Sequence, residues 1–211
     1  MTWYDYVNIG LLIIIWCIIF VDLRSTLAAR VYWVSFFGVY TLTEFFSIIV
    51  LMGYKNNLWL YNVSKPIQFI LVTAYLLSTL GVARFKLIYW LAATSGISLY
   101  FLQLQSKEWD NYHSLEDVVF GAVIITLCIF YFRKIIRSPS VSLATSEFWF
   151  CSSLFTYFGA NLWINGAMDY LIENKLESAS SLFYGLIINS YILYGITITA
   201  LIAALHNKVN T

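Results

Sequence analysis

Charged residues, histidines and cysteines are scarce in this sequence. Asp, Glu, Lys and Arg make up only 11% of the 211 residues, against about a quarter in a soluble domain. The net charge of +1 provides no bulk field that would attract nucleic acid. The cysteines Cys17, Cys128 and Cys151 lie inside apolar runs, where a thiol behaves as a small hydrophobic group. The composition therefore indicates no nucleic-acid partner and no disulfide framework.

Sequence patterns for catalysis and cofactor binding are also missing. The two histidines, His113 and His206, form no H-x-x-x-H or H-E-x-x-H motif that would bind a metal. No serine lies in a G-x-S-x-G context, and the chain has neither a phosphate loop nor a dinucleotide fingerprint. These absences argue against an enzyme, and they indicate no cofactor and no metal.

Long apolar runs are what the chain has instead. Hydrophobic residues make up 61% of it, and a helix that spans a bilayer needs about 20 mostly apolar residues. The runs predict an all-α fold in which residues 1–211 form a single integral membrane domain, a polytopic bundle of seven transmembrane helices in a lipid bilayer. The expected spans lie near residues 7–23, 31–52, 58–80, 87–104, 114–135, 147–168 and 181–205.

The distribution of charge predicts how the bundle is oriented. The loops after the first, third and fifth expected helices, together with the C-terminal tail, hold twice as many Lys and Arg residues as the other loops. Positive residues stay preferentially in the cytoplasm, so we expect the N-terminus outside and the C-terminus inside. Acidic residues gather on the outer face, which weakly favours a cationic ligand. They are Asp5, Glu108, Asp110, Glu116, Asp117, Asp169, Glu173 and Glu177.

Pro66 leaves the start of the third helix open. If the helix begins at Leu58, the proline lies inside it and Lys65 lies within the membrane at a depth similar to that of Glu44. If the helix begins at Pro66, Lys65 is an interfacial residue. The first alternative predicts that Glu44 and Lys65 are in contact, directly or through one water molecule, because opposite charges attract strongly in a medium of low dielectric constant.

Polar side chains within the spans gather in the outer half of the expected bundle. Ionisable residues at membrane depth are costly and mark function by default. Lys65 and Gln68 are three residues apart and Asn161 and Asn165 are four apart, so each pair shares a helix face. We therefore expect an outward-facing polar cavity that binds a small molecule. The expected lining is Glu44, Lys65, Gln68, Asn161, Asn165, Asn189, Tyr40, Tyr75, Tyr157 and Tyr191.

A purely structural interpretation of the same residues stays open. The amides would then hydrogen-bond one helix to another, and Glu44 would be a salt-bridged or protonated group that only fixes helix packing. A proton-coupled role for Glu44 requires burial away from Lys65, because burial favours the neutral acid and a nearby ammonium favours the carboxylate.

A weak internal repeat is visible in the pattern of spans. The first three and the last three expected helices would run in the same directions around a connecting fourth, as in transporters with parallel repeats. Trp33 and Trp149 are separated by the same number of residues as Met52 and Met168. This layout predicts a small-solute transporter as an alternative function.

Four short stretches resemble a group of known proteins. They are Leu42-Thr43-Glu44-Phe45, Asn57-Leu58-Trp59-Leu60-Tyr61, Phe148-Trp149 and Phe158-Gly159-Ala160-Asn161. In these stretches, and in helix count and spacing over most of the chain, the sequence resembles small seven-helix inner-membrane proteins of unassigned function from Bacteroidetes-type bacteria. The resemblance implies a multi-pass protein of the bacterial plasma membrane and adds no activity.

The sequence thus supports three hypotheses for function. The first is a receptor or sensor that binds a small molecule from the outer side and signals through a membrane partner protein. The second is the transporter, with Glu44 as a proton carrier. The third is a structural subunit of a membrane complex, in which the polar groups only join helices.

Overall fold

The computed structural model describes residues 3–22, 28–53, 57–81, 94, 98, 114–137, 145–174 and 178–209. Six helices account for nearly all of this part of the chain, which contains no strand. They are α1 (Trp3–Asp22), α2 (Ala28–Gly53), α3 (Leu58–Leu80), α5 (Ser114–Arg137), α6 (Ser146–Glu173) and α7 (Ser178–Val209). The expected fourth span, 87–104, lies outside the described residues apart from the helical positions Thr94 and Ser98.

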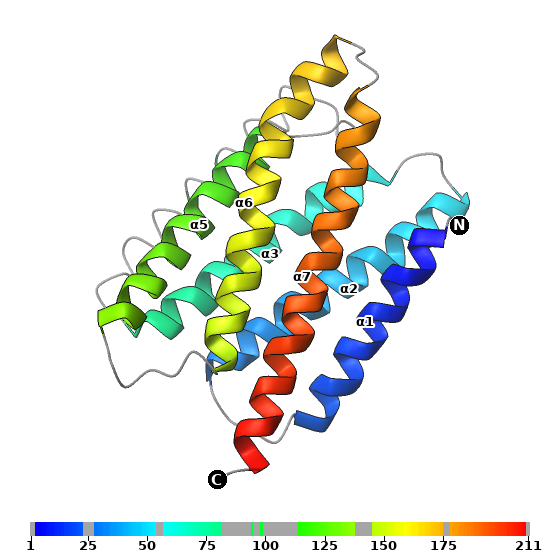
Figure 1. The fold of residues 1–211 in the computed structure, drawn as a ribbon. Coiled ribbons are helices and arrows are strands. Elements are labelled where there is room, and N and C mark those ends of the chain that lie inside the picture. The colour runs from blue at the N-terminus through cyan, green and yellow to red at the C-terminus, as the bar shows by residue number, and fades with distance from the viewer. Residues whose placement is uncertain are drawn as a thin grey trace.

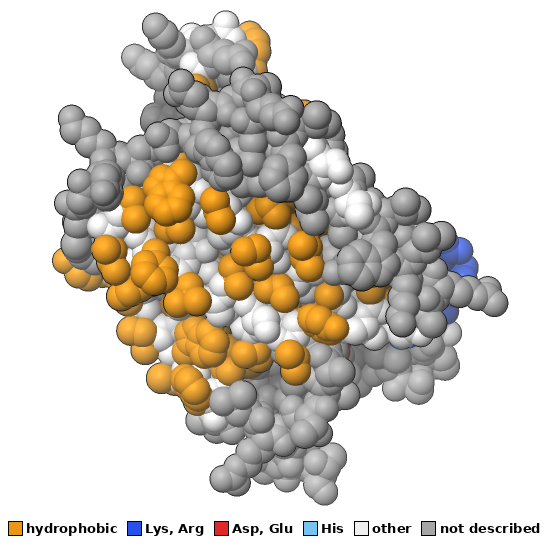
Figure 2. Space-filling model, turned by 180° about the vertical axis from the view of Figure 1, so that it is seen from behind, with side chains coloured by type: hydrophobic (Ala, Val, Ile, Leu, Met, Phe, Trp, Pro, Cys, Tyr) orange, Lys and Arg blue, Asp and Glu red, His pale blue; other side chains and the backbone are white. Residues whose placement is uncertain are grey.

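Four of the six helices are long and apolar enough to cross a membrane. The qualifying segments are Val31–Val50, Leu58–Leu80, Leu115–Arg137 and Tyr184–Ile202, and Tyr4–Phe20 is apolar but shorter. Large apolar side chains also cover the outside of the bundle, as with Trp163, which is 81% exposed. Figure 2 shows one face on which hydrophobic side chains are widespread and basic ones appear only at the edge. This is the pattern of a helical membrane protein, because a helix satisfies its own backbone polar groups in lipid.

The helices form a closed ring in the order α1, α2, α3, α5, α6, α7 and back to α1. Two contacts show that α3 and α5 run parallel. In their first halves Lys65 Nζ of α3 lies 3.0 Å from Asp117 Oδ2 of α5, and at their ends Lys134 Nζ donates to the Leu80 carbonyl oxygen at 3.1 Å. The end of α3 and the start of α5 therefore lie at opposite ends of the bundle.

Contacts between neighbours also fix the directions of α1 and α2. Asn8 contacts Glu44, whereas Trp16, further along α1, contacts the earlier residue Thr41 on α2. The two helices are therefore antiparallel. The chain termini lie at opposite ends of the bundle (Figure 1). We call the end where α1 begins the N-terminal end and the other the C-terminal end.

The third helix begins at Leu58, so Pro66 lies inside it, as the first of the two alternatives predicts. A proline is tolerated within a membrane helix where neighbouring groups satisfy the freed backbone carbonyl. Helix α6 begins behind Thr145, whose side-chain oxygen accepts a hydrogen bond from the Phe148 amide at 3.3 Å. The observed α3 has the expected bounds, and the other described helices extend a few residues beyond theirs.

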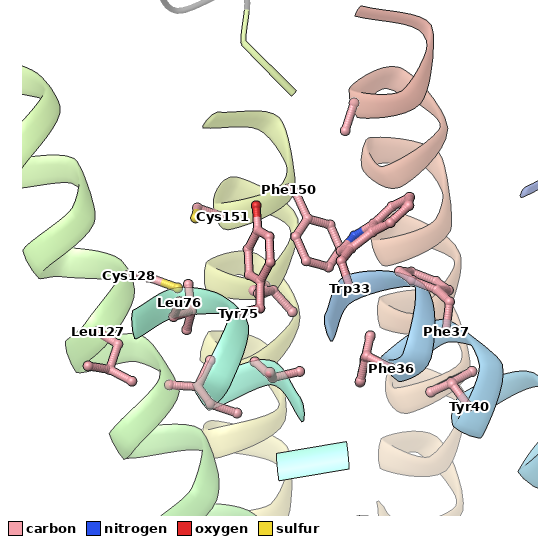
Figure 3. Close-up of a cluster of buried hydrophobic side chains, with 14 of the residues drawn as sticks. Trp33, Phe36, Phe37, Tyr40, Tyr75, Leu76, Leu127, Cys128, Phe150 and Cys151 are labelled. Carbon is pink, nitrogen blue, oxygen red and sulfur yellow. The ribbon is translucent and has the colours of Figure 1, made fainter. Parts of the chain in front are cut away.

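Aromatic side chains fill the bundle near its C-terminal end. The Phe150 ring from α6 contacts Trp33 from α2 at a centroid distance of 4.9 Å and Tyr75 from α3 at 4.8 Å, both edge to face (Figure 3). Phe36 and Phe37 are fully buried beside them. We refer to Trp33, Phe36, Phe37, Tyr75 and Phe150 as the aromatic layer. It joins three helices across the middle of the ring.

Candidate functional site

Glu44 lies at the centre of a polar network formed by three helices. Asn8 Nδ2 of α1 donates to Glu44 Oε2 at 2.9 Å, and the hydroxyl of Tyr61 on α3 lies 3.3 Å from the same oxygen. The Tyr61 hydroxyl also lies 3.0 Å from Ser47 Oγ, one turn further along α2. Glu44 precedes the end of α2 by about 14 Å at 1.5 Å per residue. The carboxyl group is therefore held well inside the bundle by neutral partners.

Three further tyrosines surround this carboxyl group. Tyr40, Tyr157 and Tyr194 lie close enough to Glu44 to interact with it electrostatically. The rings of Tyr40 and Tyr194 meet edge to face with centroids 6.0 Å apart, so side chains of α2 and α7 meet inside the ring of helices. Together with Tyr61, four tyrosines, from α2, α3, α6 and α7, thus interact electrostatically with one carboxyl group.

Two asparagines extend the network between α6 and α7. Asn189 Nδ2 donates to the Tyr157 carbonyl oxygen and to Asn161 Oδ1, both at 2.7 Å. Tyr157 links this pair to Glu44, because its side chain interacts with both Asn161 and Tyr40. We call the combined set the polar centre. Its members are Asn8, Tyr40, Glu44, Ser47, Tyr61, Tyr157, Asn161, Asn189 and Tyr194.

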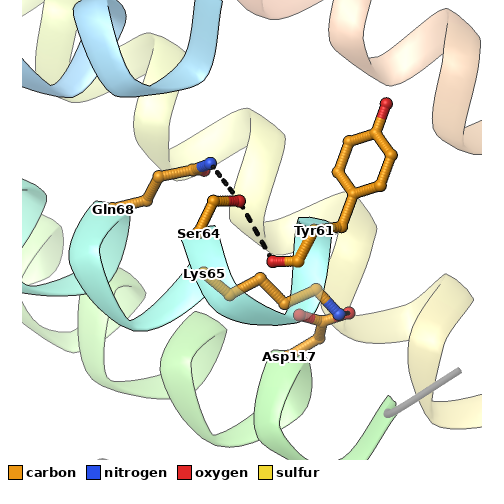
Figure 4. A network of polar contacts seen from close by, with 5 residues as sticks. All are labelled: Tyr61, Ser64, Lys65, Gln68 and Asp117. Carbon is orange, nitrogen blue, oxygen red and sulfur yellow. Dashed lines mark hydrogen bonds and ion pairs between the residues drawn. The ribbon is translucent and has the colours of Figure 1, made fainter. Parts of the chain in front are cut away.

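The predicted contact between Glu44 and Lys65 is wrong. Lys65 Nζ instead forms an ion pair with Asp117 Oδ2 at 3.0 Å (Figure 4). The buried Glu116 carboxyl group also interacts electrostatically with this ammonium. Lys65 lies seven residues from the start of α3 and Glu44 nine residues from the end of α2, but the Lys65 side chain extends toward α5 (Figure 4). Depth alone therefore did not identify the partner.

The other expected lining residues have separate positions. Gln68 Nε2 donates to Ser64 Oγ within α3 at 3.2 Å. The Tyr191 hydroxyl donates to the Tyr4 carbonyl oxygen at 3.1 Å and so joins α7 to α1. Asn165 is buried, and Tyr75 belongs to the aromatic layer. The residues that the structure brings together are Glu44, Tyr40, Tyr157, Asn161 and Asn189, and an open cavity among them stays a prediction.

The sequence analysis missed four members of the polar centre, namely Asn8, Ser47, Tyr61 and Tyr194. Asn8 and Tyr61 lie near the expected outer ends of their helices, where polar and aromatic residues are common. One signal was available for Asn8, because it is the only amide in an otherwise apolar run from Val7 to Val21. For Tyr61 no comparable signal exists in the sequence.

The fold and the site define a class, an all-α membrane protein with a buried polar centre and an aromatic layer between that centre and its C-terminal end. No protein-family model, curated protein or solved structure matches the chain. Functional inference therefore depends on the geometry of this one molecule.

Proposed function

We propose that the chain is a receptor or sensor in which the polar centre binds a small molecule that enters from the N-terminal end. One observation carries the proposal, namely the position of the aromatic layer. Trp33 precedes Glu44 by about 16 Å along α2 at 1.5 Å per residue, and its ring packs against Phe150 across the bundle. A solute at Glu44 thus meets packed aromatic rings on the C-terminal side, which favours binding over passage.

We further propose seven spans, with the N-terminus outside and the C-terminus in the cytoplasm. Parallel α3 and α5 support this count, because residues 82–113 connect opposite ends of the bundle and contain the expected span 87–104. The orientation is supported by Arg133, Lys134 and Arg137 at the C-terminal end of α5. The resemblance to inner-membrane proteins of Bacteroidetes-type bacteria supports a location in a bacterial plasma membrane.

Reporter fusions test the topology directly. A reporter fused after Thr211 is expected to report cytoplasm, and one inserted in the 105–113 segment is expected to report the outside. The difference follows from the positive-inside rule and from an odd number of crossings. If both fusions report the same side of the membrane, the proposed seven spans are contradicted. If the Thr211 fusion reports the outside and the 105–113 insertion reports cytoplasm, the proposed orientation is contradicted.

Ligand binding is tested by stabilisation of the purified protein. A panel of small ammonium compounds, neutral alcohols and carboxylates is added in detergent, and unfolding is followed by a thermal melt. A compound that binds the folded state at 100 times its Kd contributes about 2.7 kcal/mol. We expect stabilisation by an ammonium compound that is lost in Asn189→Ala and retained in Lys134→Met, whose side chain bonds the carbonyl groups at the end of α3. No stabilisation across the panel would count against the proposal.

A transporter is the second candidate, and the arrangement of the helices favours it. Helices α1–α3 run in the same successive directions as α5–α7. The neighbour contacts also repeat between the two halves, because α1 contacts α2 as α5 contacts α6, and α2 contacts α3 as α6 contacts α7. Transporters with parallel repeats have this layout.

Uptake of the stabilising compound by liposomes would favour the transporter, whereas binding without uptake would favour the receptor. A stable copurifying membrane protein with no ligand effect would favour the structural subunit.

A further inference from the structure

The hydrogen bonds around Glu44 require one more proton than the neighbouring hydroxyl groups supply. Ser47 Oγ donates its proton to the main-chain oxygen of Glu44 at 2.9 Å. The Tyr61 hydroxyl has one proton, yet its oxygen lies 3.0 Å from Ser47 Oγ and 3.3 Å from Glu44 Oε2. Tyr61 can donate to only one of these two oxygens. All three contacts are hydrogen bonds at the same time only if Tyr61 donates to Ser47 and Glu44 itself carries a proton that it donates to Tyr61.

The groups that face Glu44 supply no positive charge in the described part of the chain. They are Asp5 and Asn8 on α1, Tyr40 and Ser47 on α2, Tyr61 on α3, Tyr157 on α6 and Tyr194 on α7. Asp5 adds negative charge, and the lysine at similar depth, Lys65, is paired with Asp117. A carboxylate in an apolar interior without a counter-charge is costly. The surroundings therefore favour the neutral acid.

We propose that Glu44 is a proton-binding site and that Tyr61 changes hydrogen-bond partner with its occupancy. When Glu44 is protonated, it donates to the Tyr61 oxygen, and Tyr61 donates to Ser47. When the proton leaves, the carboxylate accepts the Tyr61 proton and the bond from Tyr61 to Ser47 is lost. The charged form then draws water or a cation toward Glu44 from the N-terminal end. This site goes beyond the small-molecule receptor and stands whether or not an organic ligand binds.

The switch couples three helices through one oxygen atom. Glu44 Oε2 is the acceptor for Asn8 of α1 and the partner of Tyr61 of α3. Deprotonation changes the charge at the point where α1, α2 and α3 meet. The helices around Glu44 are therefore the elements that rearrange when the proton leaves.

Infrared spectroscopy of the full chain in lipid vesicles tests the proposal without any ligand. At pH 7 the wild-type protein is expected to show the C=O band of a protonated carboxyl group that is absent in Glu44→Gln and present in Glu116→Gln. The band is expected to move to higher frequency in Tyr61→Phe, because the acceptor of the acid proton is removed. A spectrum in which Glu44→Gln removes no protonated-acid band would overturn the proposal.

Carbodiimide labelling gives a second measurement. It uses only the wild-type protein, so it tests the proposal even if a variant fails to fold. The carboxyl O–H adds across the N=C=N group to form an O-acylisourea, which rearranges to a stable N-acylurea that mass spectrometry locates. Labelling of Glu44 is expected at pH 6 and is expected to fall about tenfold for each pH unit above its titration midpoint. Absence of label on Glu44 at pH 6, with label on other carboxyl groups, would contradict the site. The thermal melt with ligands and these two measurements on Glu44 therefore test the receptor proposal and the proton-site proposal separately.

Discussion

Replacing Lys65 by methionine is expected to lower the free energy of unfolding by about 2–4 kcal/mol. The ammonium lies 3.0 Å from the Asp117 carboxylate, and the two side chains are 19% and 18% exposed. This burial lies between that of a surface pair, worth about 0–1 kcal/mol, and that of a fully buried pair, whose disruption costs about 3–5 kcal/mol. Removal of the ammonium also leaves Asp117 beside the buried Glu116 without its cation.

Denaturant titration in mixed micelles measures this change, and two variants serve as controls. Lys134→Met removes a lysine that donates to two backbone carbonyl groups at the end of α3, so its cost is expected to stay below about 1 kcal/mol. Asp117→Asn in the Lys65→Met background is expected to recover much of the loss, because the carboxylate that loses the Lys65 ammonium is then replaced by a neutral amide. Equal effects of Lys65→Met and Lys134→Met would show that the ion pair contributes little.

Helix positions could be predicted from this sequence because a spanning helix has a nearly fixed length. The apolar run that starts at Leu58 and ends at Leu80 matches α3 residue for residue. The expected depth of a side chain follows from its distance along that run, which is why Glu44 and Lys65 were expected at similar depths. The number and order of the apolar runs also predicted that the first three and the last three helices run in the same successive directions.

The partners of polar side chains could not be predicted, because they depend on how each helix is rotated about its axis. Helical periodicity relates directions within one helix but not between helices. Tyr61 and Lys65 are one turn apart on α3, yet Tyr61 reaches Glu44 on α2 and Lys65 reaches Asp117 on α5. Packing of the ring sets this rotation. A pairing inferred from depth and charge alone therefore selected the wrong carboxyl group.

The partners of the asparagines in the last two helices were easier to predict than the partner of Lys65. Asn161 and Asn189 were expected to line the same region, and the two side chains form a hydrogen bond at 2.7 Å. Neighbouring helices joined by a short connection must be antiparallel, so polar groups at equal depth have few alternative partners. For Lys65 the choice was wider, because α3 has both α2 and α5 as neighbours.

Replacing Phe150 by alanine is expected to lower the free energy of unfolding by about 2–4 kcal/mol. Lipid is as apolar as the interior of the bundle, so little is gained by transferring the ring from one to the other. The cost arises from the cavity left behind, at about 24 cal/mol per Å³, and from lost edge-to-face contacts worth about 0.5–1.5 kcal/mol each. Phe150 is only 3% exposed and contacts the rings of Trp33 and Tyr75, so little can collapse into the space.

Phe155→Ala is the matched control for Phe150→Ala, because it removes the same ring from the same helix. Phe155 is 38% exposed and, in the described part of the chain, has one ring contact, with Phe132 at 5.8 Å. Lipid can fill the space that it leaves, so the expected cost is below about 1 kcal/mol. Phe150→Leu keeps most of the volume and is expected to fall between the two. If Phe150→Ala costs no more than Phe155→Ala in the same denaturant titration, the aromatic layer does not hold the C-terminal half of the bundle together. The receptor proposal would then lose its structural basis, because it depends on the aromatic layer blocking the passage of a solute. The proton site at Glu44 would be unaffected, because none of its hydrogen bonds involves Phe150.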